Sequence, residues 1–194
     1  MREPGDRLCE RLGVWPVRIT AAGIHGWSLW FDGDPDLLLV RGGVIPLFPS
    51  PDALVAALAS EPEAYLPPAV TQLDPASLEG ILAAKAATFD LDAASAWFAR
   101  PDREADQSSC AQALNAINLA ADIGASVNDA DLAALYGSEA LTPAHDALTF
   151  GQTVLGDGGP YRDDPAAMVA AITPEAADAA VRLLALATAH IEIA

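Results

Sequence analysis

A small polar residue followed by proline occurs at five places, and this repeated pair most constrains the fold. Proline fits the first turn of a helix because its missing N–H needs no partner there, and a small polar residue before it caps the helix. The pairs are Ser50-Pro51, Asp74-Pro75, Thr142-Pro143, Asp164-Pro165 and Thr173-Pro174. Four of them lie beyond residue 70, so the chain has a helical part preceded by a part of different character.

The apolar residues beyond residue 70 recur at helical spacing. Glycines follow several of these segments, as is typical of helix C-termini, and Gly124 is expected to end a long central helix. The predicted helices cover residues 75–87, 91–99, 104–123, 129–136, 142–155, 165–171 and 174–191.

Residues 14–48 have the pattern of an antiparallel β-meander. Four short runs rich in aliphatic and aromatic residues, "VWPVRIT", "WSLWF", "DLLLV" and "VIPLF", are separated by glycine- and aspartate-containing turns. The helix that begins after Ser50 is expected to cover this sheet. The predicted fold is therefore α+β, with a meander and its helix at 1–62, a linker at 63–74 and a mainly α-helical domain at 75–194.

Two segments resemble a known group of proteins. The run "LFPSPDALVAALA" and the downstream "FDLDAASAWFA" are similar to small actinobacterial proteins that are often labelled primosomal protein. The resemblance covers about a quarter of the chain and rests on structural motifs. It implies an acidic α+β organisation and carries no activity and no functional residues.

Acidic charge dominates the composition. There are 27 acidic against 10 basic residues, which gives a formal net charge of -17, and Lys85 is the one lysine. Such a field repels nucleic-acid phosphates and anionic lipids and attracts basic proteins. Acidity that serves solubility alone is the alternative interpretation. The first residues lack the apolar run of a signal peptide, and no stretch has the length of a membrane span, so we expect a cytoplasmic protein.

No motif points to a catalytic residue, a cofactor or a metal. Asp32, Asp34 and Asp36 alternate as in a calcium loop, but that loop needs glycine and glutamate where this chain has Leu37 and Gly43. We therefore predict a hairpin turn there.

The cysteines and histidines give no stronger signal. Cys110 shares a helical face with Leu114 and Ile117, which is typical of a core cysteine rather than a nucleophile. His145 and His190 have no partner at ligand spacing. An enzymatic activity is therefore not expected, although the sequence does not decide the question.

Two groups of residues are candidates for binding a ligand or a partner. Asn115, Asn118 and Asp122 form a narrow polar stripe on an otherwise apolar helix. The stripe can be a wet edge, a ligand-facing line or a structural hydrogen-bond network, and the network is favoured because asparagine is a poor helix former. The second group, Tyr161, Arg162 and Asp163, lies in a glycine-rich loop that can also be a plain turn.

These patterns predict a non-catalytic protein that binds another protein with a basic surface, in a regulatory, immunity, antitoxin or nucleic-acid-mimic role. Direct binding to nucleic acid or membrane is not expected, and the oligomeric state stays open. The alternative is a small-molecule binder or enzyme with a pocket between the meander and the helical domain.

Overall fold

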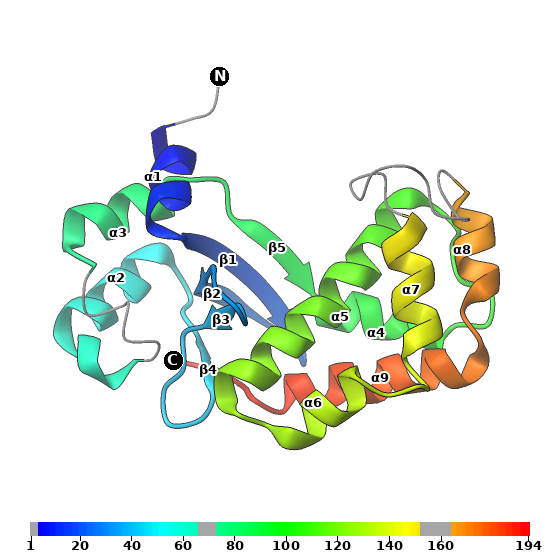
Figure 1. Cartoon of the computed structure of the whole chain (residues 1–194). Coiled ribbons are helices and arrows are strands. Elements are labelled where there is room, and N and C mark those ends of the chain that lie inside the picture. The colour runs from blue at the N-terminus through cyan, green and yellow to red at the C-terminus, as the bar shows by residue number, and fades with distance from the viewer. Residues whose placement is uncertain (1–3, 66–72, 152–163) are drawn as a thin grey trace. The chain divides into compact units, whose positions relative to one another are not determined.

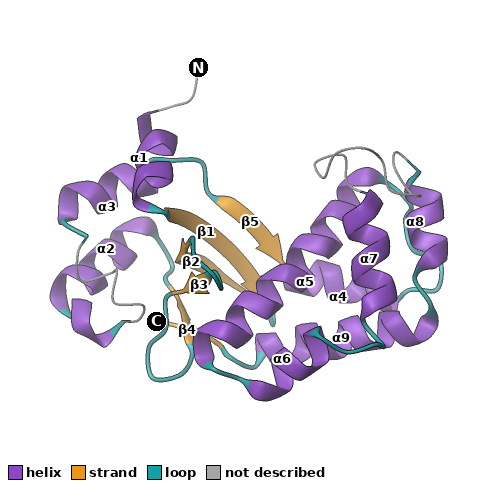
Figure 2. Ribbon diagram, in the orientation of Figure 1, coloured by secondary structure: helices purple, strands orange, loops and turns teal. Residues whose placement is uncertain are grey.

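The computed structural model describes residues 4–65, 73–151 and 164–194 and divides the chain into two compact units. The first unit contains the described residues up to Phe89 together with 122–129 and 190–194. The second contains the described residues of 90–121 and 130–189. A sheet near the N-terminus and helices along the rest of the chain confirm the predicted α+β class (Figures 1 and 2).

The elements begin and end as follows. Up to residue 90 the chain forms α1 (Pro4–Leu12), β1 (Val14–Ala21), β2 (Ile24–Phe31), β3 (Leu37–Leu38), β4 (Ile45–Leu47), α2 (Pro51–Ser60), the 3-10 turn η1 (Pro62–Ala64), α3 (Pro75–Leu82) and β5 (Ala87–Asp90). Beyond it lie α4 (Leu91–Ala99), α5 (Gln107–Val127), α6 (Ala130–Tyr136), α7 (Thr142–Gly151), α8 (Pro165–Ala171), α9 (Pro174–Thr188) and β6 (Ile191–Ile193).

Three strands of the predicted meander, β1, β2 and β3, form a sheet of order β3-β2-β1-β5 with β5, whereas the fourth, β4, pairs with β6 in a second sheet. β1 and β2 form an antiparallel hairpin in which Trp15 lies opposite Trp30. Ala22 and Gly23 form its two-residue turn, and both have positive φ, which matches the right-handed twist of the strands. The predicted turn at Asp32–Asp36 is also confirmed, since it joins β2 to the antiparallel β3.

Both faces of this hairpin are buried. Val14, Leu29 and Phe31 belong to a core cluster that includes Leu54 of α2 and Ile81 of α3. On the opposite face Val17, Ile19 and Ser28 are also buried. A hairpin that is buried on both faces needs other elements packed against each face. The helix predicted to cover the sheet, α2, is only one of the elements that the first unit uses.

The first unit also contains segments from far along the chain. β6 pairs in parallel with β4, so that Ile45 lies opposite Ile191. The carboxylate of Asp129 contacts Nε2 of His190 at 2.7 Å, which ties the end of α5 to the start of β6. The boundaries therefore differ from the expected 1–62, 63–74 and 75–194, because α3 joins the first core and β6 returns to the first sheet region.

The second unit consists of helices packed around α9. α9 packs against α4, α6 and α7, and α7 packs against α8. Small side chains on α9 permit close approach, since Ala176, Ala179 and Ala180 are fully covered.

Polar–proline pairs begin four of the five helices as predicted. At Ser50, Asp74, Asp164 and Thr173 the side chain accepts a backbone N–H of the first turn. Thr142 differs: it is the first residue of α7, and its hydroxyl donates to the Ser138 carbonyl. In the turn before α7, the Ser138 hydroxyl accepts the Leu141 N–H at 3.3 Å.

Gly124 does not end the central helix, contrary to expectation. α5 continues to Val127, and Asn128, with φ of 57°, takes the left-handed position at which a helix stops. Gly124 is a buried residue inside the helix.

In the described part of the chain, no helix combines the length and the apolar character needed to cross a membrane.

Substitution of Gly26 tests how β4 is held against β2. Trp27 and Phe48 exchange two backbone hydrogen bonds of 2.7 and 2.9 Å, and a Cβ at Gly26 lies 2.8 Å from the Phe48 carbonyl oxygen. Gly26→Ala should therefore lower the free energy of unfolding by about 1–3 kcal/mol in urea denaturation. Gly137→Ala is the control, because its Cβ meets only an ordinary 3.5 Å contact. Equal effects at the two positions would contradict this packing.

Candidate functional site

The predicted site residues lie in different surroundings. Tyr161, Arg162 and Asp163 fall outside the described residues. Asn115 and Asn118 belong to the second unit, where Asn115 is exposed and Asn118 is half-buried. Asp122, also half-buried, belongs to the first unit. The three residues of the stripe therefore lie in three distinct environments.

Asn118 takes part in a polar cluster of the second unit. Its Oδ1 lies 3.3 Å from Nε2 of His145 on α7, and the Tyr136 hydroxyl lies 3.4 Å from the same nitrogen. The Tyr136 and His145 rings meet edge to face, with centroids 5.6 Å apart. One ring nitrogen can donate to the amide or accept from the hydroxyl, according to its tautomer.

This cluster is suited to docking helices. It joins α5, the end of α6 and α7 through side chains that are all partly shielded from water. Asp146 adds a carboxylate 3.9 Å from Nδ1 of His145, beyond hydrogen-bond distance. The arrangement agrees with the structural network favoured for Asn118.

Asp122 has a carboxyl group whose pKa is strongly raised. Burial raises its pKa to about 7, the Asp36 carboxylate acts in the same direction, and the Trp30 indole opposes both. The indole Nε1–H is buried and lies near this carboxyl, but their geometry falls short of a hydrogen bond.

Both cysteines are buried, as predicted for Cys110. Burial raises the pKa of the Cys110 thiol to about 11, and Asp106 adds to the shift. The pKa of Cys9 is raised by burial and by Asp6. Thiols are nucleophilic as thiolates, and burial disfavours this form for both side chains.

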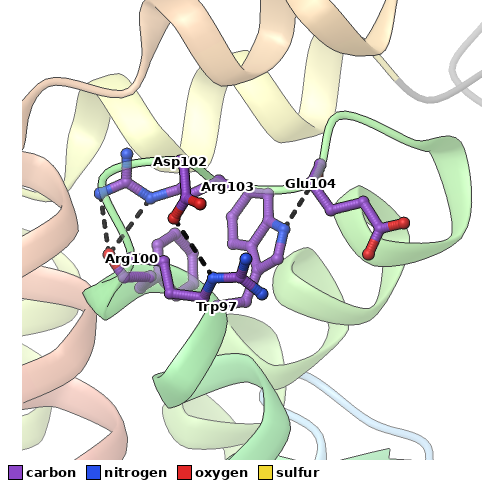
Figure 3. Close-up of polar contacts among 6 residues, drawn as sticks. Trp97, Arg100, Asp102, Arg103 and Glu104 are labelled. Atoms are coloured by element: carbon purple, nitrogen blue, oxygen red, sulfur yellow. Dashed lines mark hydrogen bonds and ion pairs between the residues drawn. The ribbon is translucent and has the colours of Figure 1, made fainter.

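The α4–α5 connection is a polar cluster that the sequence analysis missed (Figure 3). Arg103 donates from Nε and Nη2 to the Phe98 carbonyl at 3.1 and 2.8 Å, and Trp97 donates from its indole to the Glu104 carbonyl at 3.0 Å. The exposed Arg100 and Asp102 form a 3.4 Å ion pair. An arginine directly after a predicted helix can donate hydrogen bonds to the last carbonyls of that helix, so Arg100 and Arg103 were a signal in the sequence.

An apolar crevice lies between α6 and α9. Ala134 and Leu135 line it from α6, and Ala185 and Leu186 line it from α9, with Asp131 and Arg182 alongside. Leu186 is 39% exposed, which is high for a leucine on a packed helix. Among the described residues, no three histidine, cysteine or acidic side chains are grouped to hold a metal ion.

The two asparagines provide a matched pair of substitutions. Asn118→Ala should lower the free energy of unfolding by about 0.5–1.5 kcal/mol, because it removes the His145 contact. Asn115→Ala, on the same helix, should change it by less than about 0.5 kcal/mol, because Asn115 is exposed. Urea denaturation of both variants measures the difference, and a larger loss at Asn115 would refute the network assignment.

Two arginines test the α4–α5 connection in the same way. Arg103→Gln should cost about 1–2 kcal/mol, because two charge-assisted bonds to the Phe98 carbonyl are lost. Arg100→Gln removes a largely exposed ion pair and should cost less than about 0.5 kcal/mol. Thermal unfolding at matched pH separates the two, and similar losses would mean that Arg103 does not hold the connection.

Comparison with known proteins gives a fold relation. A solved structure described as the SatS C-terminal domain in complex with bromine has a TM-score of 0.61 and 21% identity to this chain. The match covers 99% of this chain and 100% of that one. No family model matches the chain, and no curated protein matches it. At this identity the likeness shows that the two proteins share a fold.

Proposed function

We propose that this protein acts by binding another protein that has a basic, amphipathic surface, and not by catalysis. The observation that carries the proposal is the acidic surface of the second unit. Eight of its described acidic residues are exposed, against two exposed basic residues, Arg100 and Arg182. Such an excess attracts cationic partners over distances comparable to the Debye length.

The first unit contributes less to this field. Its described residues include nine exposed acidic and five exposed basic side chains, so its surface is closer to balance. One exposed base, Arg41, is paired with Glu61 at 2.9 Å and stacks on Tyr65. A basic partner is therefore expected to contact the second unit.

Charge steers a partner, whereas burial of apolar surface supplies much of the affinity. The α6–α9 crevice offers apolar side chains within this acidic unit: Leu135 and Leu186 line it, and Asp131 and Arg182 lie beside them. A helix with lysine or arginine on one side and aliphatic residues on the other fits this chemistry.

The same charge disfavours direct contact with nucleic acid or membrane, whereas the expected location and the lack of a cofactor rest on the sequence patterns. The proposed protein works in the cytoplasm, without a cofactor and without contacting nucleic acid or membrane directly. Its relation to the actinobacterial proteins stays a prediction, because the comparisons concern the fold.

A lysine-rich amphipathic helical peptide serves as a defined probe. We expect it to bind, and its affinity to fall at least about tenfold as ionic strength rises from about 0.01 M to about 0.15 M, because the Debye length shrinks from about 30 Å to about 8 Å. Fluorescence anisotropy of the labelled peptide measures this dependence. A glutamate-rich peptide of the same apolar pattern is the control and should not bind.

Two leucines of equal exposure locate the contact. Leu186→Ser in the crevice should weaken binding severalfold, whereas Leu12→Ser on α1 should leave it unchanged, since Leu12 is 38% exposed but lies in the first unit. Binding that is indifferent to salt, or that accepts the glutamate-rich peptide, would overturn the proposal. Equal effects of the two substitutions would place the contact elsewhere.

A further inference from the structure

Strand β6 is hydrogen-bonded to β4 along one of its two edges. The Ile45 N–H donates to the His190 carbonyl at 2.7 Å, and the Ala194 N–H donates to the Leu47 carbonyl at 3.0 Å. These two bonds lie at opposite ends of the parallel pairing between the strands. They show that the backbone groups of residues 190, 192 and 194 face β4.

The backbone groups of Ile191 and Ile193 therefore face the other way. In a parallel pair, alternate residues of a strand direct their N–H and C=O toward the neighbouring strand, and the residues between them direct these groups away from it. In the described part of the chain this sheet consists of β4 and β6, so no described strand lies at the outer edge of β6. Ile191 is 8% exposed and Ile193 is 52% exposed, so the accessible part of the edge centres on Ile193.

The side chains at this edge combine apolar surface with a negative charge. Ile193 lines a shallow hollow together with Val44 and Pro46. Glu192 lies opposite Pro46 in the pairing, and its side chain is exposed. An outward-facing N–H and C=O, an exposed aliphatic side chain and a carboxylate thus adjoin one another.

The carboxylate of Glu192 is not compensated. Arg41 lines the same hollow, but its guanidinium is paired with Glu61 at 2.9 Å and stacks on the Tyr65 ring. Among the described residues Glu192 forms no ion pair. Its charge is therefore available to a cation from outside the chain.

We propose that the outer edge of β6 binds an extended segment of a partner protein as an added β-strand, and that this segment alternates aliphatic and cationic side chains. Main-chain hydrogen bonds hold an added strand, and its alternate side chains give specificity. Side chains beside Ile193 and beside Glu192 point to opposite faces, so the first are matched by aliphatic residues and the second by lysine or arginine. This inference concerns the first unit and does not depend on the helical partner proposed for the second.

A second copy of this chain fits the edge less well. Antiparallel pairing of two β6 strands through Ile191 and Ile193 places the Glu192 side chains of the two copies opposite each other, and like charges in that position destabilise the pair. The formal net charge of -17 on each chain adds to the repulsion. Charge complementarity therefore favours a cationic segment.

A short peptide of alternating valine and lysine is the probe. We expect it to bind the wild-type protein and, at saturation, to slow amide hydrogen exchange at Ile193 by at least about tenfold. Exchange at Ala194 should change little, because its N–H is already bonded to Leu47. If Ile193 is protected before peptide is added, or becomes protected as protein concentration rises, this chain or a second copy covers the edge and the proposal is overturned.

Methylation of the peptide nitrogens separates strand addition from binding by charge alone, and it needs no protein variant. In an extended peptide the N–H groups of the valines point to one edge and those of the lysines to the other. Methylation of one set should abolish binding, whereas methylation of the other set should leave it nearly unchanged, because one edge of the peptide pairs with β6. Equal effects of the two methylated peptides would contradict strand addition.

Substitution of Ile193 tests the backbone contact from the protein side. Ile193→Pro removes the outward N–H, leaves the bonds to β4 in place and should weaken peptide binding at least about fivefold. Ile193→Val keeps the N–H and the branched side chain and should bind nearly as well as the wild type. Equal affinities of these two variants would refute the contact.

A pair of charge reversals tests the alternation. Glu192→Lys should weaken binding of the valine–lysine peptide and permit binding of a valine–glutamate peptide. Glu79→Lys makes the same change of charge at an exposed position on α3 and should do neither. Leu186→Ser should leave binding unchanged, which distinguishes this edge from the α6–α9 crevice. Equal effects of the two charge reversals would mean that net charge, and not the β6 edge, selects the peptide.

Discussion

Burial of both faces of the β1–β2 hairpin is the constraint on which the first unit depends. One face is covered by the core that includes Leu54 and Ile81, which places α2 and α3. The other face, with Val17 and Ile19, must also be kept from water. The first unit also includes the end of α5 and the β6 strand from far along the chain.

Much of the fold could be predicted because its signals are local. In a polar–proline pair, the polar side chain caps the first turn of the helix, and the proline lacks the N–H that would need a partner there. Both effects are contained within a few residues. The missed elements depend on distant partners. β6 is a strand only because β4 lies beside it, and α1 is a polar helix whose Cys9 is buried by the tertiary fold. β6 is too short to carry a pattern of its own, whereas Leu8, Cys9 and Leu12 of α1 stand at helical spacing.

The candidate site could be predicted in part for a similar reason. Helical periodicity placed Asn115, Asn118 and Asp122 in one line, and the structure agrees that they share α5. The surroundings of each residue depend on residues remote in sequence, such as His145 for Asn118 and Asp36 for Asp122. Spacing along one helix contains no information about those partners, so the line suggested one site where there are separate environments.

The parallel pairing of β4 with β6 has a consequence for biosynthesis. Ile45 leaves the ribosome early, but its partner Ile191 is made only after every helix of the second unit. Until then the outer side of β4 has unpaired backbone groups, and His190 is absent from its contact with Asp129. The first unit thus completes its folding only after the helices of the second unit have been synthesised, although most of its own residues precede them.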